Sequence, residues 1–147
     1  MFVTRATKAD LSAVQALLDM YPGAHMTVGP EHFTTKDIAL QVRLGSGEMV
    51  AFCWVGVMAG NTVGFVDKVV IHPGYSKQGI STIIYQELVR LAAKRGVKSL
   101  FGTIMQGAYH DASCANAVKM GMNTMPGSYS ISYGSINEMS KLMNGEL

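Results

Sequence analysis

The segment Tyr75–Ser81, YSKQGIS, has residue types and spacing that suit the binding of a phosphate group. It lies between an apolar stretch ending in Ile71-His72-Pro73 and a stretch of helical periodicity. Backbone N–H groups that enter a helix lack intrahelical acceptors, and the helix dipole adds partial positive charge to them. Gly79 lets the backbone approach a ligand closely or adopt a positive φ. The segment therefore predicts either a phosphate cradle or a plain connection from strand to helix.

Composition excludes several classes of protein. The 147 residues suffice for one compact domain, which we expect to span residues 1–147. A hydrophobic content of 48% and a charged content of 15% argue against disorder. No apolar run approaches the roughly 20 residues of a membrane helix. The N-terminal sequence lacks the apolar segment of a signal peptide, so we expect a cytoplasmic protein without a membrane partner.

Charge and metal-binding residues narrow the choice further. A net charge of +2 does not favour nucleic acid as a partner. Cys53 and Cys114 have no C-x-x-C spacing, and the histidines show no ligand spacing. We therefore expect neither a disulfide framework nor a metal site.

Periodicity indicates which elements position the segment. Apolar and β-branched runs predict strands over residues 2–5, 49–58, 62–71 and 97–105, and alternation predicts one over 128–133. Helical spacing and capping signals predict helices over residues 11–20, about 38–44, 81–95 and 111–120 and from residue 135 on.

The order of these elements predicts a single-domain α/β fold with a mixed central sheet and flanking helices. The crossover from residues 62–71 to residues 97–105 has the length of a βαβ unit, so these two strands should be parallel. In the last strand we expect Tyr129, Ile131 and Tyr133 to pack against the sheet's covered face. An edge strand of this kind would also allow a homodimer.

Several motifs resemble those of the GCN5-related N-acetyltransferase (GNAT) superfamily. Arg5-Ala6-Thr7-Lys8-Ala9-Asp10-Leu11 is close to the "R-x-A-x-x-x-D-L" entry to that family's first helix. Ile71-His72-Pro73 followed by Ser76–Ser81 stands in the place of its "V-x-P" and "[RQ]-x-x-G-x-[GA]" signature. Ala117–Met122 stands where the family usually has "Y-x-x-x-G-F".

The chain also departs from the family pattern. Ser76 replaces the leading arginine or glutamine, and Ser81 replaces the closing glycine or alanine. Ala117 replaces the tyrosine that often serves as the general acid. Only two strands are predicted between Gly47 and Pro73, where the family usually has three. These departures indicate a trimmed or divergent member.

The resemblance implies acetyl-CoA as the acyl-donating co-substrate. Its pyrophosphate would lie against the main chain of the cradle, and Lys77 and the hydroxyls of Ser76 and Ser81 would replace the missing arginine. The backbone of residues 69–71 would pair with the pantetheine arm in a gap of the sheet, as an added strand does. The expected cofactor-binding residues are Val69, Val70, Ile71, Ser76, Lys77, Gln78, Gly79, Ile80 and Ser81.

The resemblance also implies three candidate catalytic residues. An ammonium must lose a proton before it can attack a thioester. Asp67 lies where many family members carry an acidic residue, and regular alternation would place it on one face with Val69 and Ile71, opposite Lys68. Because Ala117 has no proton to give, Tyr109 and Cys114 are the candidate proton donors to the departing thiolate.

The resulting hypothesis is an N-acetyltransferase that moves an acetyl group from acetyl-CoA directly to an amine of a small molecule or a protein. Two alternatives stay open on the sequence. Ser76 and Ala117 also fit a catalytically inactive binding or inhibitory protein on the same fold. A GNAT-like enzyme that modifies a nucleobase is a third class, to which the small net charge lends little support.

Overall fold

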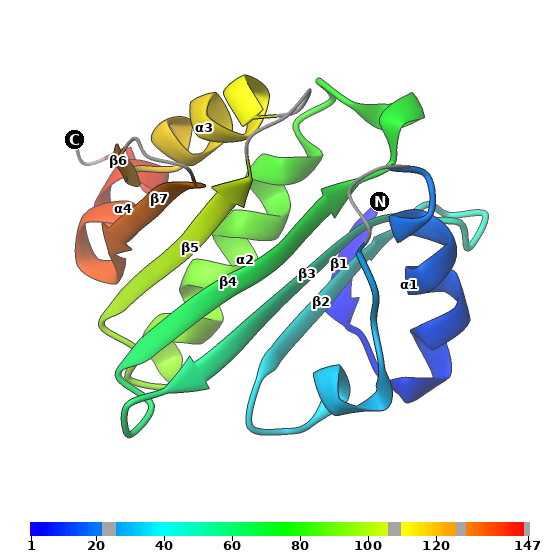
Figure 1. Ribbon diagram of the computed structural model, residues 1–147, viewed down its shortest axis with the longest axis horizontal. Coiled ribbons are helices and arrows are strands. Elements are labelled where there is room, and N and C mark those ends of the chain that lie inside the picture. The colour runs from blue at the N-terminus through cyan, green and yellow to red at the C-terminus, as the bar shows by residue number, and fades with distance from the viewer. Residues whose placement is uncertain (22–25, 106–109, 126–128, 146–147) are drawn as a thin grey trace.

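The computed structural model describes residues 1–21, 26–105, 110–125 and 129–145. Within them the chain forms one seven-stranded mixed sheet in the order β1-β2-β3-β4-β5-β7-β6 (Figure 1). In chain order the elements are β1 (Phe2–Arg5), η1 (Lys8–Asp10), α1 (Leu11–Leu18), η2 (Pro30–Phe33), β2 (Ile38–Arg43), β3 (Met49–Met58), β4 (Val63–Ile71), η3 (Pro73–Tyr75), α2 (Ile80–Lys94), β5 (Ser99–Met105), α3 (His110–Lys119), β6 (Asn123–Met125), β7 (Tyr129–Ser135) and α4 (Ile136–Met143).

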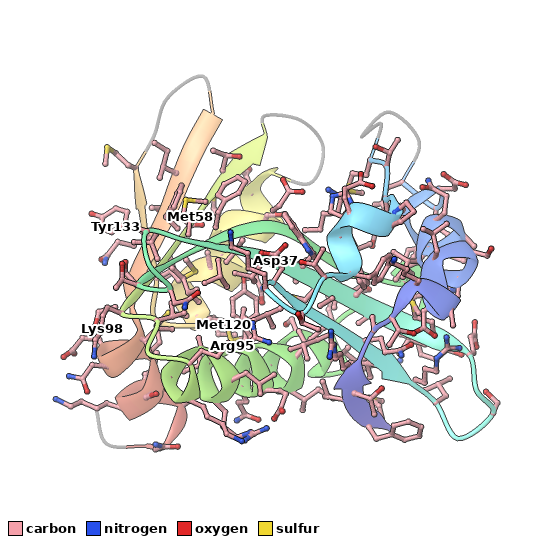
Figure 2. All side chains as sticks on the ribbon, turned by 90° about the horizontal axis from the view of Figure 1, so that it is seen from below. Asp37, Met58, Arg95, Lys98, Met120 and Tyr133 are labelled. Atoms are coloured by element: carbon pink, nitrogen blue, oxygen red, sulfur yellow. The ribbon has the colours of Figure 1, made fainter. Side chains whose placement is uncertain are left out.

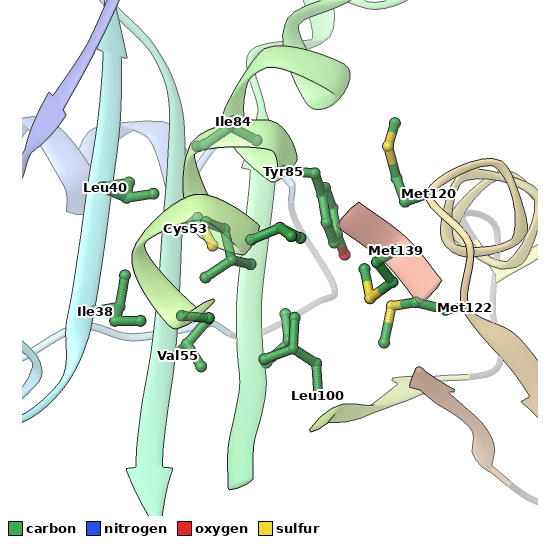
Figure 3. Close-up of a cluster of buried hydrophobic side chains, with 14 of the residues drawn as sticks. Ile38, Leu40, Cys53, Val55, Ile84, Tyr85, Leu100, Met120, Met122 and Met139 are labelled. Atoms are coloured by element: carbon green, nitrogen blue, oxygen red, sulfur yellow. The ribbon is translucent and has the colours of Figure 1, made fainter. Parts of the chain in front are cut away.

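Two hydrophobic clusters hold the helices to opposite faces of the sheet. In the larger cluster, Ile80, Ile84 and Leu88 of α2 face the strands, and each of these side chains is buried. Figure 3 shows part of this cluster, with Ile84 of α2 and Cys53 and Val55 of β3 labelled. On the other face α1 packs through Leu17 and Leu18. α2 therefore holds the segment Tyr75–Ser81, which we call the cradle segment, in position relative to β4.

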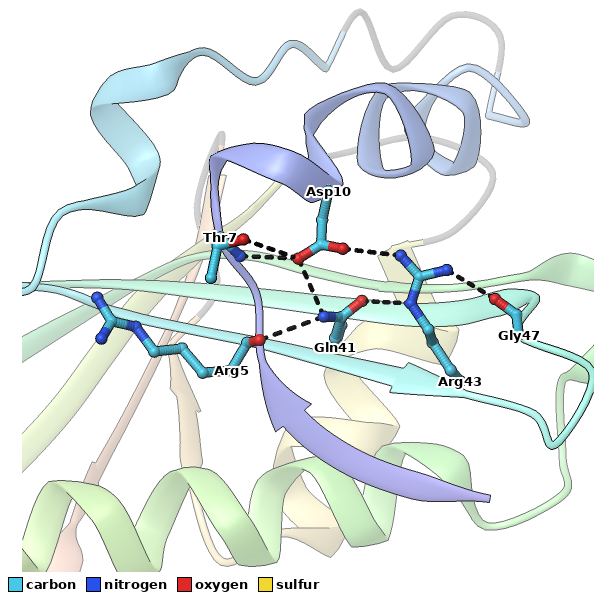
Figure 4. Close-up of polar contacts among 6 residues, drawn as sticks. All are labelled: Arg5, Thr7, Asp10, Gln41, Arg43 and Gly47. Carbon is cyan, nitrogen blue, oxygen red and sulfur yellow. Dashed lines mark hydrogen bonds and ion pairs between the residues drawn. The ribbon is translucent and has the colours of Figure 1, made fainter.

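The Arg5–Leu11 motif has a structural explanation in a polar network around Asp10 (Figure 4). One carboxylate oxygen of Asp10 accepts the Thr7 N–H at 2.8 Å and the Gln41 amide at 3.1 Å. The other oxygen accepts the Arg43 guanidinium at 2.8 Å. Asp10 therefore caps the first turn, as predicted, and also ties that turn to β2.

The predicted helix near residues 38–44 is wrong, because Ile38–Arg43 is the strand β2. The Thr34 hydroxyl donates to the Asp37 carboxylate at 3.2 Å, and the Asp37 N–H donates to the Thr34 carbonyl at 3.4 Å, which closes a turn before the strand. β2 pairs with β1 on one side and β3 on the other. It supplies the strand that seemed to be missing, so the sheet is not trimmed.

The predicted parallel pairing of the βαβ unit is confirmed. β3 and β4 pair antiparallel, and β4 and β5 pair parallel. Gly96 closes α2 with a φ of +85°. The last helix begins at the predicted cap, where the Ser135 hydroxyl accepts the Glu138 N–H at 3.3 Å.

The alternation predicted for β7 is present, but its faces are the reverse of the expectation. Ser132 is 6% exposed, whereas Ile131 and Tyr133 are 38% and 43% exposed. The small residues face inward because α4 packs closely there: a Cβ on Gly134 would lie 3.0 Å from the Met139 sulfur. β7 is also no edge strand, since β5 and β6 flank it. The side chain of Tyr129 lies outside the described part.

Candidate functional site

The cradle segment is a tight connection whose backbone turns twice through the left-handed region. Lys77 has a φ of +61°, and Gly79, the N-cap of α2, has a φ of +77°. A Cβ on Gly79 would meet nothing within 4 Å. Glycine is therefore favoured here by its backbone conformation and not by crowding within the protein.

Main-chain donors converge where this connection enters α2. The Gly79 carbonyl accepts the N–H of Ile83 at 3.2 Å, which closes the first helical turn. The N–H groups of residues 80–82 precede that bond and have no intrahelical acceptor. They point out of the start of a 15-residue helix, where the helix dipole favours an anion.

The two serine hydroxyls of the segment donate to acceptors within the protein. Ser76 Oγ donates to the Pro73 carbonyl at 3.3 Å. Ser81 Oγ donates to Asn116 Oδ1 of α3 at 2.9 Å. A phosphate would have to displace these acceptors to receive either proton. The backbone amides are thus the donors that need no rearrangement.

β4 and β5 pair over only three residues of each strand before they separate. The pairing runs from Val63 opposite Ser99 to Phe65 opposite Phe101. β4 then continues to Ile71 and β5 to Met105, and Figure 1 shows the two strands diverging toward the end of the sheet that carries the cradle. In the described residues no strand occupies this gap.

A β-bulge in β4 lies at the start of the gap. Trp54 of β3 pairs with Lys68 and Val55 pairs with Val66, so Asp67 is an extra residue on β4. A bulge bends its strand and increases the local twist. We therefore attribute the divergence of β4 from β5 to this bulge.

The bulge also corrects the expected orientation of Asp67. Lys68 lies above the Trp54 ring, 5.9 Å from its centroid, and its ammonium forms an ion pair with Asp67. Val69 and Ile71, by contrast, pack against the cluster on the α2 side. Regular alternation predicted that Asp67 and Lys68 point apart, but the inserted residue breaks the alternation and brings them together.

Backbone groups of β4 face the gap at alternate positions. The His72 N–H donates to Val50 of β3 at 2.8 Å. Alternation along an antiparallel pair then turns the backbone of Val70 toward β3 and that of Val69 and Ile71 toward the gap. The Tyr21 hydroxyl donates to the Ile71 carbonyl, a contact that no sequence spacing signals because the two residues lie far apart in the chain.

α3 brings one candidate proton donor to the cradle end of the sheet. Cys114 is a half-buried thiol on α3. Asn116, two residues after Cys114 on α3, accepts the Ser81 hydroxyl. Ala117 is 4% exposed and packs in the core. Tyr109 lies outside the described residues.

Other reactive groups do not join this site. Cys53 is buried in the α2-side core, and burial raises the pKa of its thiol to about 12. No three His, Cys, Asp or Glu side chains in the described ranges converge as metal ligands. Each helix in those ranges is too short or too polar to cross a bilayer.

A second missed cluster adjoins the cradle. The Tyr75 hydroxyl donates to Glu48 at 3.2 Å, and the Glu48 carboxylate raises the pKa of that phenol. His72 Nδ1 accepts the Gly74 N–H at 2.9 Å, and its ring packs edge-on against Tyr75. These contacts hold η3 against the start of β3. No sequence spacing signals them, since Glu48 lies far from the segment along the chain.

A cavity of about 210 Å³ lies elsewhere, between β1, β2 and α2. The charged groups on its α2 wall already have partners. Glu87 pairs with Arg90, and the Arg95 guanidinium donates to the carbonyls of Lys36 and Asp37. This cavity is lined by the opposite half of α2 and is separate from the cradle.

The whole arrangement is similar to that of solved N-acetyltransferases. Ribosomal-protein-S18-alanine N-acetyltransferase from Escherichia coli has a TM-score of 0.76 at 18% identity, with 92% of this chain and 93% of that chain covered. PaiA N-acetyltransferase from Thermoplasma acidophilum, solved with coenzyme A, has a TM-score of 0.73 at 10% identity, covering 91% and 98%. An aminoglycoside 6'-N-acetyltransferase complexed with coenzyme A has a TM-score of 0.73 at 14% identity, covering 92% and 97%.

These likenesses define the class of fold, a mixed α/β acetyltransferase fold. No curated protein matches the sequence. The sequence profile of the Acetyltransferase (GNAT) family matches residues 13–122, well over half of the chain. The protein belongs to the GNAT family.

Proposed function

We propose that this protein is an N-acetyltransferase that moves an acetyl group from acetyl-CoA directly to an amine. The observation that carries the proposal is the continuity of two sets of backbone groups that have no strand or intrahelical partner among the described residues. The β4 edge beyond Phe65 leads along the gap to the amides that open α2. A pantetheine arm has amides that can pair with a strand edge, and its pyrophosphate suits helix-entry donors.

The proposal gives positions to the pantetheine arm, the pyrophosphate and the thioester. The backbone of Val69 and the N–H of Ile71 would pair with the pantetheine amides, with Val70 holding the strand to β3. The pyrophosphate would lie against the main chain of residues 76–81, with the Lys77 ammonium beside it. The thioester would then reach the bulge at Asp67.

The transfer needs one base for the acceptor amine and one proton donor for the leaving thiolate. Asp67, directly or through a water molecule, takes a proton from the acceptor ammonium once its contact with Lys68 opens. The amine lone pair attacks the thioester carbonyl carbon, and the C–N bond forms. The nitrogen loses its surplus proton to solvent as the C–S bond breaks, and the thiolate of coenzyme A takes a proton from Cys114, Tyr109 or solvent. The products are the amide and free coenzyme A.

A binding-only protein is the second candidate. Its support is that Asp67 already has an ionic partner, Lys68, and that Ala117 is buried and has no proton to give. Such a protein would bind coenzyme A or a partner and release no thiol from acetyl-CoA.

Calorimetric titration of acetyl-CoA into Gly79 variants tests the cradle. A side chain at this position enters open space where the phosphate would lie. Gly79→Trp should weaken binding at least tenfold, whereas Gly79→Asn, whose small side chain tolerates a positive φ, controls for the backbone. Equal affinities in both variants would refute the cradle. Saturable binding without thiol release, across a panel of amines, would favour the binding-only protein.

A further inference from the structure

A row of aromatic side chains crosses the sheet beside the gap. Phe65 of β4 lies opposite Phe101 of β5, and Phe101 lies opposite Tyr133 of β7. The rings of Phe65 and Phe101 are 5.1 Å apart between centroids. Ile131 lies two residues from Tyr133 along β7 and so faces the same way. We call Phe65, Phe101, Ile131 and Tyr133 the aromatic floor.

No helix of the described residues covers the aromatic floor. Its neighbours Leu100 and Ser132 point the other way, into the side of the sheet where the core is buried. Figure 2, which looks along the sheet, has Tyr133 and Met58 on the side opposite α2. The floor thus leaves large apolar side chains open to a ligand.

The floor begins where the proposed chemistry takes place. Phe65 and Phe101 form the last pair before the strands separate. Asp67, the proposed base, is two residues further along β4. A molecule whose amine nitrogen reaches Asp67 would therefore lay its remaining atoms over the rings of the floor.

Charge on this face does not match a polycationic acceptor. Among the described residues that these strands turn to this side, Asp67 and Lys68 carry charge, and they neutralise each other as an ion pair. Binding of several ammonium groups calls for several unpaired carboxylates. An acceptor with one amine on a neutral apolar body does not need several carboxylates.

The exposed area is also too small for a second protein subunit. A large side chain has on the order of 200 Å² of surface, so Ile131 and Tyr133 together expose roughly 160 Å². With Met58 and Met125 at the margins the apolar area is roughly 350 Å², against about 800 Å² on each partner of a stable complex. This area fits a ligand with one ring or a short alkyl group.

We infer that the acceptor is a primary amine on an uncharged aryl or alkyl body, such as an arylalkylamine, held by the aromatic floor. The inference rests on the proposed acetyl transfer and names its substrate class. The amine nitrogen lies at Asp67, and the ring stacks on Phe101 and Tyr133. Catalysis of the transfer itself does not involve the floor.

The test compares acetylation of 2-phenylethylamine with that of 1,4-diaminobutane by the whole protein, following thiol release from acetyl-CoA. We expect kcat/KM for 2-phenylethylamine to exceed that for the diamine at least tenfold. Tyr133→Ser should raise KM for 2-phenylethylamine roughly tenfold, the scale of a lost aromatic contact. Phe2→Ser, which changes a half-exposed aromatic residue on the opposite edge strand, should leave it unchanged.

The outcomes separate this inference from the proposed function. Acetyl-CoA binding should be unchanged in Tyr133→Ser, because the floor does not contact the cofactor. Faster transfer to 1,4-diaminobutane or to a peptide with an N-terminal alanine would overturn the inference and leave the acetyltransferase intact. A KM for 2-phenylethylamine that is equal in wild type and Tyr133→Ser would also overturn it. Failure of the wild type to bind acetyl-CoA would refute both.

Discussion

Replacing Gly102 with alanine adds one methyl group where β4 and β5 separate. The new Cβ would lie 2.7 Å from the backbone carbonyl oxygen of Val66, whereas ordinary contact begins at 3.4 Å. The obstacle is main chain, which cannot swing aside as the end of a flexible side chain does. β4 must therefore shift, or the strand pair must absorb the strain.

The expected cost follows from this overlap. Inserting a methyl group into a packed region usually destabilises a protein by about 1–3 kcal/mol. For a chain of this length, about 2 kcal/mol corresponds to a fall in Tm of roughly 4–8 °C. Thermal unfolding followed by circular dichroism measures the shift. Gly45→Ala is the matched control, since a Cβ there meets nothing within 4 Å.

The same variant tests the link between the gap and the cofactor. If β4 moves to relieve the contact, the affinity for acetyl-CoA should change even where the loss of stability is small. A Gly102→Ala protein with the Tm and the acetyl-CoA affinity of the wild type would refute the close approach of the two strands on which the reasoning depends.

Three further changes have defined outcomes. Burial opposes ionisation of Asp10, but its hydrogen bonds, above all from the Thr7 N–H and Arg43, outweigh this and lower its pKa below 3.8. Asp10→Asn should therefore cost about 2 kcal/mol in urea unfolding at pH 7, and the difference should shrink as the pH falls below about 4 and the wild-type carboxyl takes up its proton. A thiol reagent should label Cys114 in the native protein and leave Cys53 unlabelled until the protein unfolds, because Cys53 is buried with a pKa of about 12. Mass spectrometry of the peptides shows which cysteine is labelled. Asp67→Asn should lower kcat/KM roughly 100-fold or more while acetyl-CoA affinity stays within about twofold, and an unchanged rate would exclude Asp67 as the base.

Local signals in the sequence were enough to locate most elements and the connection over Tyr75–Ser81. Tyr75–Ser81 connects a strand to a helix as predicted, and Gly79 has the positive φ that its residue type allows. The long apolar run Met49–Met58 is a strand with those bounds. Such features depend on residues close together in the chain, so periodicity and capping are sufficient to predict them.

Features that depend on distant partners could not be predicted. Ile38 and Val42 have a spacing that fits a helix as well as a strand, and β2 is buried on both faces, so no alternation marks it as a strand. Only pairing with β1 and β3 decides the matter. The sequence also could not tell which side chains of β7 face the core. An alternating pattern allows either set to face inward, and the packing of α4 selects the small residues.

The sequence by itself determined the family, the order of most elements and the glycine-containing connection from strand to helix at Tyr75–Ser81. Tertiary structure decided which residues surround that connection. The bulge at Asp67, which depends on the register between β3 and β4, separates β4 from β5 and places Asp67 beside Lys68. The outward turn of Tyr133 exposes an apolar surface next to the gap. Register and helix packing are long-range properties, which a local pattern of residues does not encode.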